Sequence, residues 1–320
     1  MTAVLLIAPM PIVPQWTGPA IRYWEFARVR STEQRVTLLV PNEDHPTHPD
    51  FQVLTCTAAG LDRLLAEHQV VVVQGPAIQE HPRLAEILGG TGHYLVADLY
   101  DPITLEQLEV DRGGRVGRWL HLEYRALLNE QLRLGDFFLC ASERQRDYWL
   151  GALAALGRVN HDTYDGGELR NLIEVVPFGL AADRPAEPAD GPSLKEKLGL
   201  AAADRLILWG GGLWDWLDPL TPIRAMALLA KRHPAARLLF FESSRQQPAM
   251  LGRARELAAD LGLLGRQVLF TDWLSPQQWR SCLLEADVGL SFHPASIETH
   301  FAFRTRLLDY IAAGLPIEIG

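Results

Sequence analysis

Cysteine is scarce in this chain, and no two cysteines have the spacing of a metal or redox motif. Cys56, Cys140 and Cys282 are an odd number, spread widely over 320 residues. Disulfide scaffolds and Cys-x-x-Cys sites need cysteines paired at characteristic spacings. We therefore predict reduced, buried thiols in a cytoplasmic protein.

Long hydrophobic runs are also absent. The longest, such as residues 3–9, 70–73 and 206–209, are strand-length, whereas a membrane helix needs about 20 apolar residues. The first run has no basic leader and is followed at once by prolines, so we expect a buried strand and no signal peptide. Peripheral association with the inner face of the membrane is left open.

The chain has no excess of basic residues. Its net charge is -9 and its pI is about 5.6, which argues against nucleic-acid binding because that requires a basic face. It also lacks the G-x-G-x-x-G fingerprint of nicotinamide dehydrogenases and the G-K-S/T ending of a phosphate-binding P-loop. Those two nucleotide-binding classes are disfavoured.

What the sequence does contain is a regular alternation of short apolar runs and helical patterns, typical of parallel sheets built from strand–helix–strand units. We predict an α/β protein with two Rossmann-like, doubly wound domains facing a cleft. Residues 1–178 form the first domain, residues 179–192 a linker rich in Pro, Ala and Asp, and residues 193–320 the second, incomplete domain. Predicted strands are 3–8, 35–40, 70–74, 93–98, 136–140, 174–177, 205–209, 236–241, 267–270, 288–291 and 317–319.

Ligands bind such sheets at the carboxyl ends of the strands, so the loops after strands are the candidate sites. In the second domain, three glycines (210–212) followed by Leu213 and Trp214 can cradle a diphosphate with backbone N–H groups. A tight turn is the alternative for this loop.

The segment from Glu298 to Pro316 carries the strongest chemical signal. Arg304, Thr305 and Arg306 stand near the start of a predicted helix, where the macrodipole and guanidinium groups attract phosphate. Asp309, one turn later, is placed to accept hydrogen bonds from a ribose or sugar hydroxyl. Glu298 is expected to bind sugar hydroxyls. A metal site formed with His293 and His300 matches no standard spacing and is disfavoured.

In the first domain, the loop ending at Thr17 and Gly18, with Tyr23 in the helix that follows, is a candidate acceptor site. The alternative is an ordinary capped helical turn without a binding role. Asp98 and Asp101 end a predicted strand and could orient an acceptor hydroxyl or accept its proton. Helix capping is again the alternative.

Taken in order along the chain, these loops resemble the retaining glycosyltransferase family 4, which has the B-type two-domain fold. The resemblance implies that the first domain binds an acceptor and the second a nucleotide sugar, with no metal or other cofactor. It also implies that Asp309 contacts the ribose. The acceptor would be a glycan, a lipid or a small molecule.

Three departures from the family pattern stand out. Phe301 occupies the register of the family's first acid, so Glu298 can substitute only if the loop is rearranged. No cation follows the glycine loop before Arg224, so the diphosphate would rely on Arg304, Arg306 and Arg245. The third departure is that the sequence stops soon after Pro316. We expect a truncated domain that self-associates or is marginally stable, and a monodisperse monomer with a high, cooperative melting temperature would contradict this.

The expected reaction is transfer of a sugar from a nucleoside diphosphate to a hydroxyl with retention at the anomeric carbon. Arg304 and Arg306 would stabilise the departing diphosphate. Two alternatives stay open. One is a nucleotide-sugar or glycan-binding homologue with little or no activity, and the other is a sugar-nucleotide epimerase.

Overall fold

The structure is a computed structural model that describes residues 2–13, 16–80, 84, 86, 92–180, 192–242 and 248–320. The chain forms two compact units. One comprises Met1–Phe178 and Phe301–Phe303, and the other Gly179–His300 and Arg304–Gly320. Most of the linker expected at residues 179–192 lies outside the described residues.

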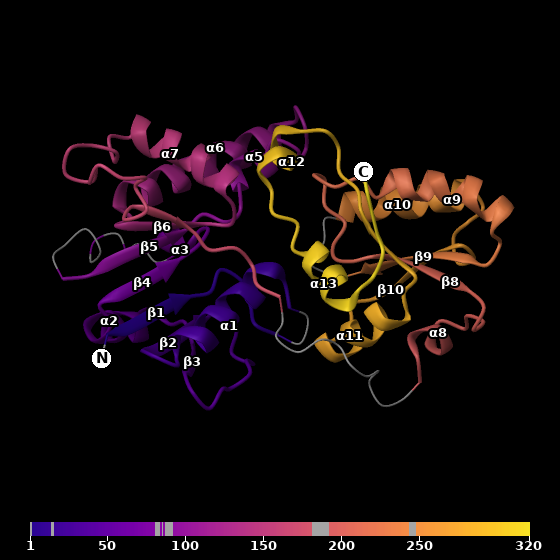
Figure 1. Ribbon diagram of the computed structural model, residues 1–320, viewed down its shortest axis with the longest axis horizontal. Helices are drawn as coiled ribbons and strands as arrows, with labels where there is room; N and C mark the ends of the chain where they lie inside the picture. Colours follow the sequence, from indigo (N-terminus) through magenta and orange to yellow (C-terminus); the bar gives the residue numbers. More distant parts are fainter. Residues whose placement is uncertain are drawn as a thin grey trace. The chain divides into compact units, whose positions relative to one another are not determined.

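The first unit is built on a seven-stranded, wholly parallel sheet with the order β3-β2-β1-β4-β5-β6-β7 (Figure 1). Its strands are β1 (Ala3–Ile7), β2 (Arg35–Val40), β3 (Gln52–Thr55), β4 (Val70–Val73), β5 (Tyr94–Asp98), β6 (Phe137–Cys140) and β7 (Ile173–Val175). Its helices are α1 (Gly18–Arg30), α2 (Ala58–Glu67), α3 (Ala77–Glu80), α5 (Ile103–Glu106), α6 (Arg115–Leu134) and α7 (Glu143–Ala155).

Both faces of this sheet are covered, because side chains along a strand alternate between the faces. Leu5 and Ile7 of β1 pack with residues of α2 and α3. Val4 and Leu6 point the other way, into a cluster with residues of α1. Hydrophobic strands buried on two faces are what the continuous apolar runs of the sequence predict.

The second unit repeats the plan with five parallel strands in the order β10-β9-β8-β11-β12. These are β8 (Arg205–Trp209), β9 (Ala236–Glu242), β10 (Val268–Asp272), β11 (Val288–Ser291) and β12 (Ile317–Ile319). The helices α9 (Leu220–Arg232) and α10 (Pro248–Asp260) share a core cluster on one face (Figure 1). Helices α8 (Leu194–Lys197), α11 (Pro276–Glu285) and α13 (Arg306–Ala313) contribute to the cluster on the other face.

The predicted fold class of two parallel α/β sheets is confirmed, and most strands lie within two residues of their predicted ends. The strand prediction missed β3. Strand β3 is a four-residue edge strand with no fully buried residue, so it lacks the apolar run that marks the central strands. None of the helices in the described ranges has the length and apolar character needed to cross a bilayer.

Candidate functional site

In each sheet the strand order changes direction once: strands are added outward on one side of a central pair and then on the other side. In the second unit this point lies between β8 and β11, and in the first it lies between β1 and β4. The loops that leave the carboxyl ends of such a strand pair diverge and leave room for a ligand. The loops after β8 and β11 are therefore the first place to look for a site in the second unit.

The loop after β8 consists of Gly210, Gly211 and Gly212, and the structure requires glycine there. A Cβ at Gly210 would lie 2.7 Å from the Tyr310 hydroxyl oxygen and 2.9 Å from the Trp279 ring. Gly211 has φ +100°, a conformation that side chains rarely adopt. The loop is thus pressed against α11 and α13, with Gly210 and Gly212 buried and Gly211 half-buried.

Tyr310 holds this loop in place. The Gly210 N–H donates to the Tyr310 hydroxyl at 2.6 Å, and that hydroxyl lies 3.2 Å from the carbonyl oxygens of Leu208 and Leu290, to which it can donate. Tyr310 is fully buried, and burial raises its pKa to about 12. One side chain of α13 therefore ties β8, β11 and the glycine loop together.

Replacing Tyr310 with phenylalanine should destabilise the fold by about 1–3 kcal/mol, because the Gly210 N–H and a buried carbonyl each lose their partner. Chemical denaturation measures this change. Tyr94→Phe, at a tyrosine whose side chain is 62% exposed, is the matched control and should unfold as the parent does. Equal stability of the two variants would contradict the claim that the Tyr310 hydroxyl stabilises the glycine loop.

Arg306 is the first residue of α13 and lies beside the glycine loop. A Cβ at Gly211 would be 3.5 Å from Nη2 of Arg306, and the guanidinium carbon stands 5.0 Å from the Trp209 ring centroid. Among the described residues no carboxylate forms an ion pair with Arg306, and its buried Nη1 has no hydrogen-bond partner. Burial, with a smaller contribution from Arg304, lowers its pKa to about 10, so it stays charged at neutral pH.

Arg304 has a different environment. It lies before α13, and its Nη1 and Nη2 donate to the two carboxylate oxygens of Glu298 at 2.9 and 2.6 Å. The Glu298 side chain is fully buried and belongs to the short helix α12 (Ile297–Phe301). Glu298 therefore lies in a short helix, and not in the loop that the sequence predicted. The expectation that Glu298 binds a sugar and Arg304 a diphosphate is revised, because each neutralises the other.

Asp309 and Thr305 lie near Arg306, in the first turn of α13 and at its N-cap. Asp309 is exposed, and one carboxylate oxygen accepts a hydrogen bond from Nε1 of Trp279 at 3.0 Å. Thr305 is the N-cap residue of α13, although its side chain makes no capping bond. The ribose contact of Asp309 stays a prediction, now with Trp279 fixing the carboxylate.

Leu213 and Trp214, which follow the glycines, lie in different environments. Leu213 is fully buried in the core, so only its backbone can reach a ligand. Trp214 is half-buried and lies parallel to Trp216, with ring centroids 5.3 Å apart. Arg245, the third cation expected at this site, lies outside the described residues.

In the first unit, Asp98 forms a buried ion pair with Arg22. Arg22 Nε and Nη2 donate to the two carboxylate oxygens at 2.6 and 2.9 Å, and neither side chain exceeds 1% exposure. Burial raises the pKa of Asp98, and the guanidinium opposes that rise. The predicted catalytic role of Asp98 is revised to a structural one, because an acceptor cannot reach a carboxylate enclosed in this way.

Asp101 remains a candidate. It is half-buried after β5, and its carboxylate accepts a hydrogen bond at 3.3 Å from Nε2 of Gln74, which follows β4. It also hydrogen-bonds the buried Tyr100. Two loops at the carboxyl edge of the first sheet thus converge on Asp101.

The predicted acceptor residues Thr17, Gly18 and Tyr23 lie at the start of α1. Tyr23 is fully buried, so its ring belongs to the core and its predicted contact with an acceptor is revised. Thr17 occupies the N-cap position of α1 without a capping bond. The Thr17 and Tyr23 hydroxyls are both buried without a partner in the described part of the chain.

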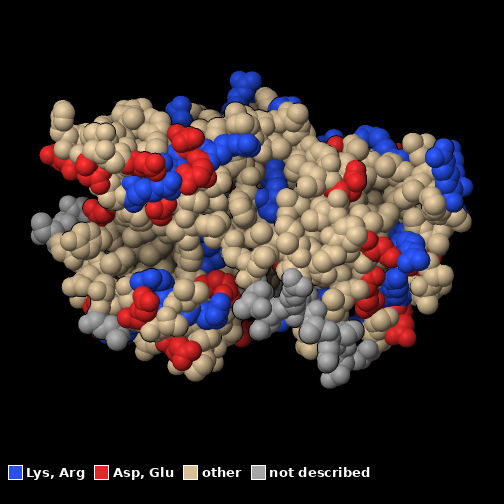
Figure 2. Space-filling model, viewed as in Figure 1, with Lys and Arg blue, Asp and Glu red and all other residues tan. Residues whose placement is uncertain are grey.

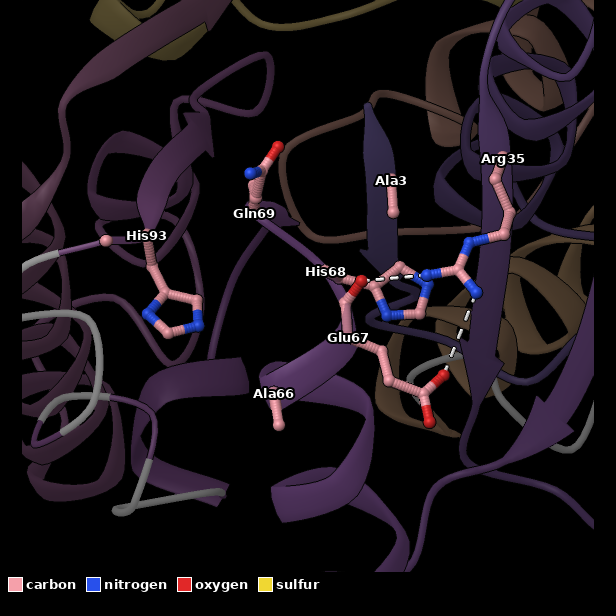
Figure 3. Close-up of a pocket in the computed structure, with 8 residues that line it drawn as sticks. Ala3, Arg35, Ala66, Glu67, His68, Gln69 and His93 are labelled. Atoms are coloured by element: carbon pink, nitrogen blue, oxygen red, sulfur yellow. Dashed lines mark hydrogen bonds and ion pairs between the residues drawn. The ribbon is translucent and has the colours of Figure 1, made fainter. Parts of the chain in front are cut away.

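A pocket of about 420 Å³ lies at the opposite, amino-terminal edge of the first sheet (Figure 3). His68 there donates from Nδ1 to the Leu64 carbonyl at 2.7 Å, so its Nε2 accepts from the Thr37 hydroxyl at 2.9 Å. Arg35 contacts the carbonyl and carboxylate of Glu67 at 2.8 and 3.8 Å. These polar groups are used to hold strand ends to α2, so we assign this pocket no catalytic role.

The sequence interpretation missed Tyr310 and Trp279. The signal for Tyr310 was its place one turn after Arg306, which puts both side chains on the same side of the helix. Trp279 carried no local signal, since it reaches Asp309 across 30 positions of sequence.

Comparison with solved structures shows the same fold in known glycosyltransferases. Sucrose-phosphate synthase from Thermosynechococcus elongatus is 14% identical with a TM-score of 0.67, covering 100% of this chain and 81% of that one. Anabaena HepE, solved with UDP-glucose, is 14% identical with a TM-score of 0.66 and coverages of 100% and 80%. WaaG, a glycosyltransferase of lipopolysaccharide biosynthesis, is 17% identical with a TM-score of 0.63 and coverages of 99% and 80%.

No model of a protein family matches the sequence, and no curated protein matches it significantly. The structural similarity therefore establishes the fold, which is that of the B-type glycosyltransferases.

Proposed function

We propose that this chain is a glycosyltransferase whose second domain binds a nucleoside-diphosphate sugar. The observation that carries the proposal is Arg306, which begins α13 beside the backbone of Gly211 and whose guanidinium has no ion-pair partner among the described residues. A half-buried cation without a counter-ion is costly, and an anionic ligand would remove that cost. A diphosphate matches the guanidinium fork, the helix N-terminus and the glycine backbone.

The donor is proposed to be a UDP-sugar. HepE, which has the same fold, was solved with UDP-glucose and with UDP. Asp309 would accept hydrogen bonds from the ribose, with the Trp279 indole orienting its carboxylate. Asp101 would orient an acceptor hydroxyl in the first domain.

The reaction is proposed to retain the configuration of the anomeric carbon. The barrier is departure of UDP, and Arg306 with the N–H groups of the α13 N-terminus would stabilise the negative charge as it grows. The leaving phosphate oxygen would take the proton of the acceptor hydroxyl, so no protein nucleophile is required. Of the two arginines near α13, this charge stabilisation relies on Arg306, because Glu298 neutralises Arg304.

A melting-shift panel of UDP, GDP and ADP tests the donor. Only UDP is expected to raise the melting temperature strongly, since a ligand that binds only the folded state stabilises it by mass action. No shift with any of the three would contradict the proposal. Equal shifts would overturn the choice of base.

Product analysis then separates the alternatives. Incubation of the chain with UDP-glucose and a pool of hydroxyl acceptors should release UDP only when an acceptor is present. Conversion of the donor to another UDP-sugar without acceptor would indicate an epimerase. Binding without any conversion would indicate an inactive homologue.

A further inference from the structure

The outer face of α6 combines exposed large hydrophobic side chains with arginines. Val116, Trp119 and Leu122 are 59%, 59% and 50% exposed. Exposed arginines at positions 115, 118 and 125 stand among them. Isolated exposed hydrophobic residues are ordinary, but three on one helix face mark an interaction surface.

The helical repeat puts the hydrophobic residues at the centre of this face. Arg115, Trp119 and Leu122 are spaced i, i+4 and i+7, so they form one stripe along the helix. The opposite stripe, which includes Leu128, Gln131 and Leu132, is buried. The helix is thus anchored to the domain by one side and presents Trp119 and Leu122, next to Arg115, on the other, where a solvent-exposed helix would normally be polar throughout.

The charge of this segment is opposite to that of the whole chain. Residues 112–125 contain four arginines and one glutamate, whereas the chain carries a net charge of -9. Figure 2 shows blue side chains at the edge of the first domain where α5 and α6 lie in Figure 1, and they are arginines because residues 1–178 contain no lysine. A partner attracted to this face therefore carries negative charge and accepts apolar side chains.

We propose that the outer face of α6 (Arg115, Val116, Arg118, Trp119, Leu122 and Arg125) docks on the surface of an anionic lipid bilayer. Trp119 and Leu122 enter the boundary between headgroups and acyl chains, where tryptophan is favoured because its ring is apolar and its N–H polar. The arginines keep their charges among the lipid phosphates, with their stems along the apolar stripe. This proposal stands on α6 alone and does not depend on the proposed sugar transfer.

Co-sedimentation of the full chain with lipid vesicles tests the proposal. The chain should bind vesicles of phosphatidylcholine mixed with phosphatidylglycerol and should bind vesicles of phosphatidylcholine alone far more weakly. Binding should fall as salt is added, because ions screen the attraction between arginines and lipid headgroups. Absence of binding to the anionic vesicles would overturn the proposal.

Two sets of variants locate the contact. Trp119→Ala is expected to weaken partitioning about tenfold, and the double variant Arg115→Ala with Arg118→Ala about 25-fold. The matched controls are Leu228→Ala, at a side chain that is 69% exposed on α9, and Arg224→Ala with Arg253→Ala on the second domain. Equal weakening by the α6 variants and their controls would contradict docking through α6.

Two further readouts separate a bilayer from a protein partner. Brominated lipids should quench a component of the tryptophan fluorescence that is lost in Trp119→Phe. Light scattering without lipid should give the same mass for the parent and Trp119→Ala. A dimer that Trp119→Ala dissociates, with no quenching by lipid, would assign this face to a second copy of the chain and overturn the proposal.

Discussion

Arg306→Ala is expected to lower the release of UDP from UDP-glucose about 100- to 1,000-fold, the effect of removing one preorganised donor of charge stabilisation. The melting temperature of the ligand-free chain should stay near that of the parent, because the guanidinium has no carboxylate partner in the described part of the chain. Kinetics and a thermal melt of the same preparation measure both quantities. Unaltered kinetics would remove Arg306 from the site.

Two other arginine variants serve as controls for this result. Arg224→Ala, at an exposed position on α9, should leave turnover unchanged. Arg304→Ala should instead destabilise the fold by about 3–5 kcal/mol, because it leaves the buried Glu298 carboxylate without its partner. Loss of stability in Arg306→Ala and not in Arg304→Ala would reverse the assignment of the two arginines.

Breaking the Arg22–Asp98 pair is expected to destabilise the fold at least as much as Arg304→Ala. Either Arg22→Met or Asp98→Leu leaves one charge uncompensated in a site that is at most 1% exposed, which costs about 3–5 kcal/mol. The Arg22 guanidinium also lies 4.5 Å from the Phe26 ring centroid, 5.1 Å from that of Tyr100 and 5.2 Å from that of Phe178, so its loss removes three cation–π contacts as well.

The double variant, Arg22→Met with Asp98→Leu, checks this interpretation. It should be more stable than either single variant, because no charge is then buried alone. Chemical denaturation of the four proteins completes the cycle. If Asp98→Leu instead kept full stability and lost turnover, the structural assignment would be wrong and Asp98 would again be a candidate catalytic residue.

The sheet architecture was predictable from the sequence because the central strands are short continuous apolar runs, as in β4 with its four valines. Strand β3 was not predictable in this way. It is half-exposed at the edge of the sheet and pairs with β2, and its two apolar residues, Val53 and Leu54, stand between Gln52 and Thr55 and form no longer apolar run.

The sequence could point to the loops of the candidate site but not to the partners of its individual side chains. The sequence placed Arg304 and Arg306 together, yet only the structure separates the arginine paired with Glu298 from the one facing Gly211. Charge partners of this kind depend on the local path of α12, which no spacing rule specifies. Likewise, nothing in the sequence around Asp98 indicated that Arg22, 76 residues earlier, would enclose it.

The central claim is that Arg306 and the glycine loop after β8 bind a diphosphate. Calorimetric titration of the chain and of Arg306→Ala with UDP and with uridine tests it most directly. The account predicts that the parent binds UDP much more tightly than uridine, and that Arg306→Ala weakens UDP binding about 10- to 100-fold with little effect on uridine. Equal affinity of the parent for UDP and uridine, or unchanged UDP affinity in Arg306→Ala, would contradict it.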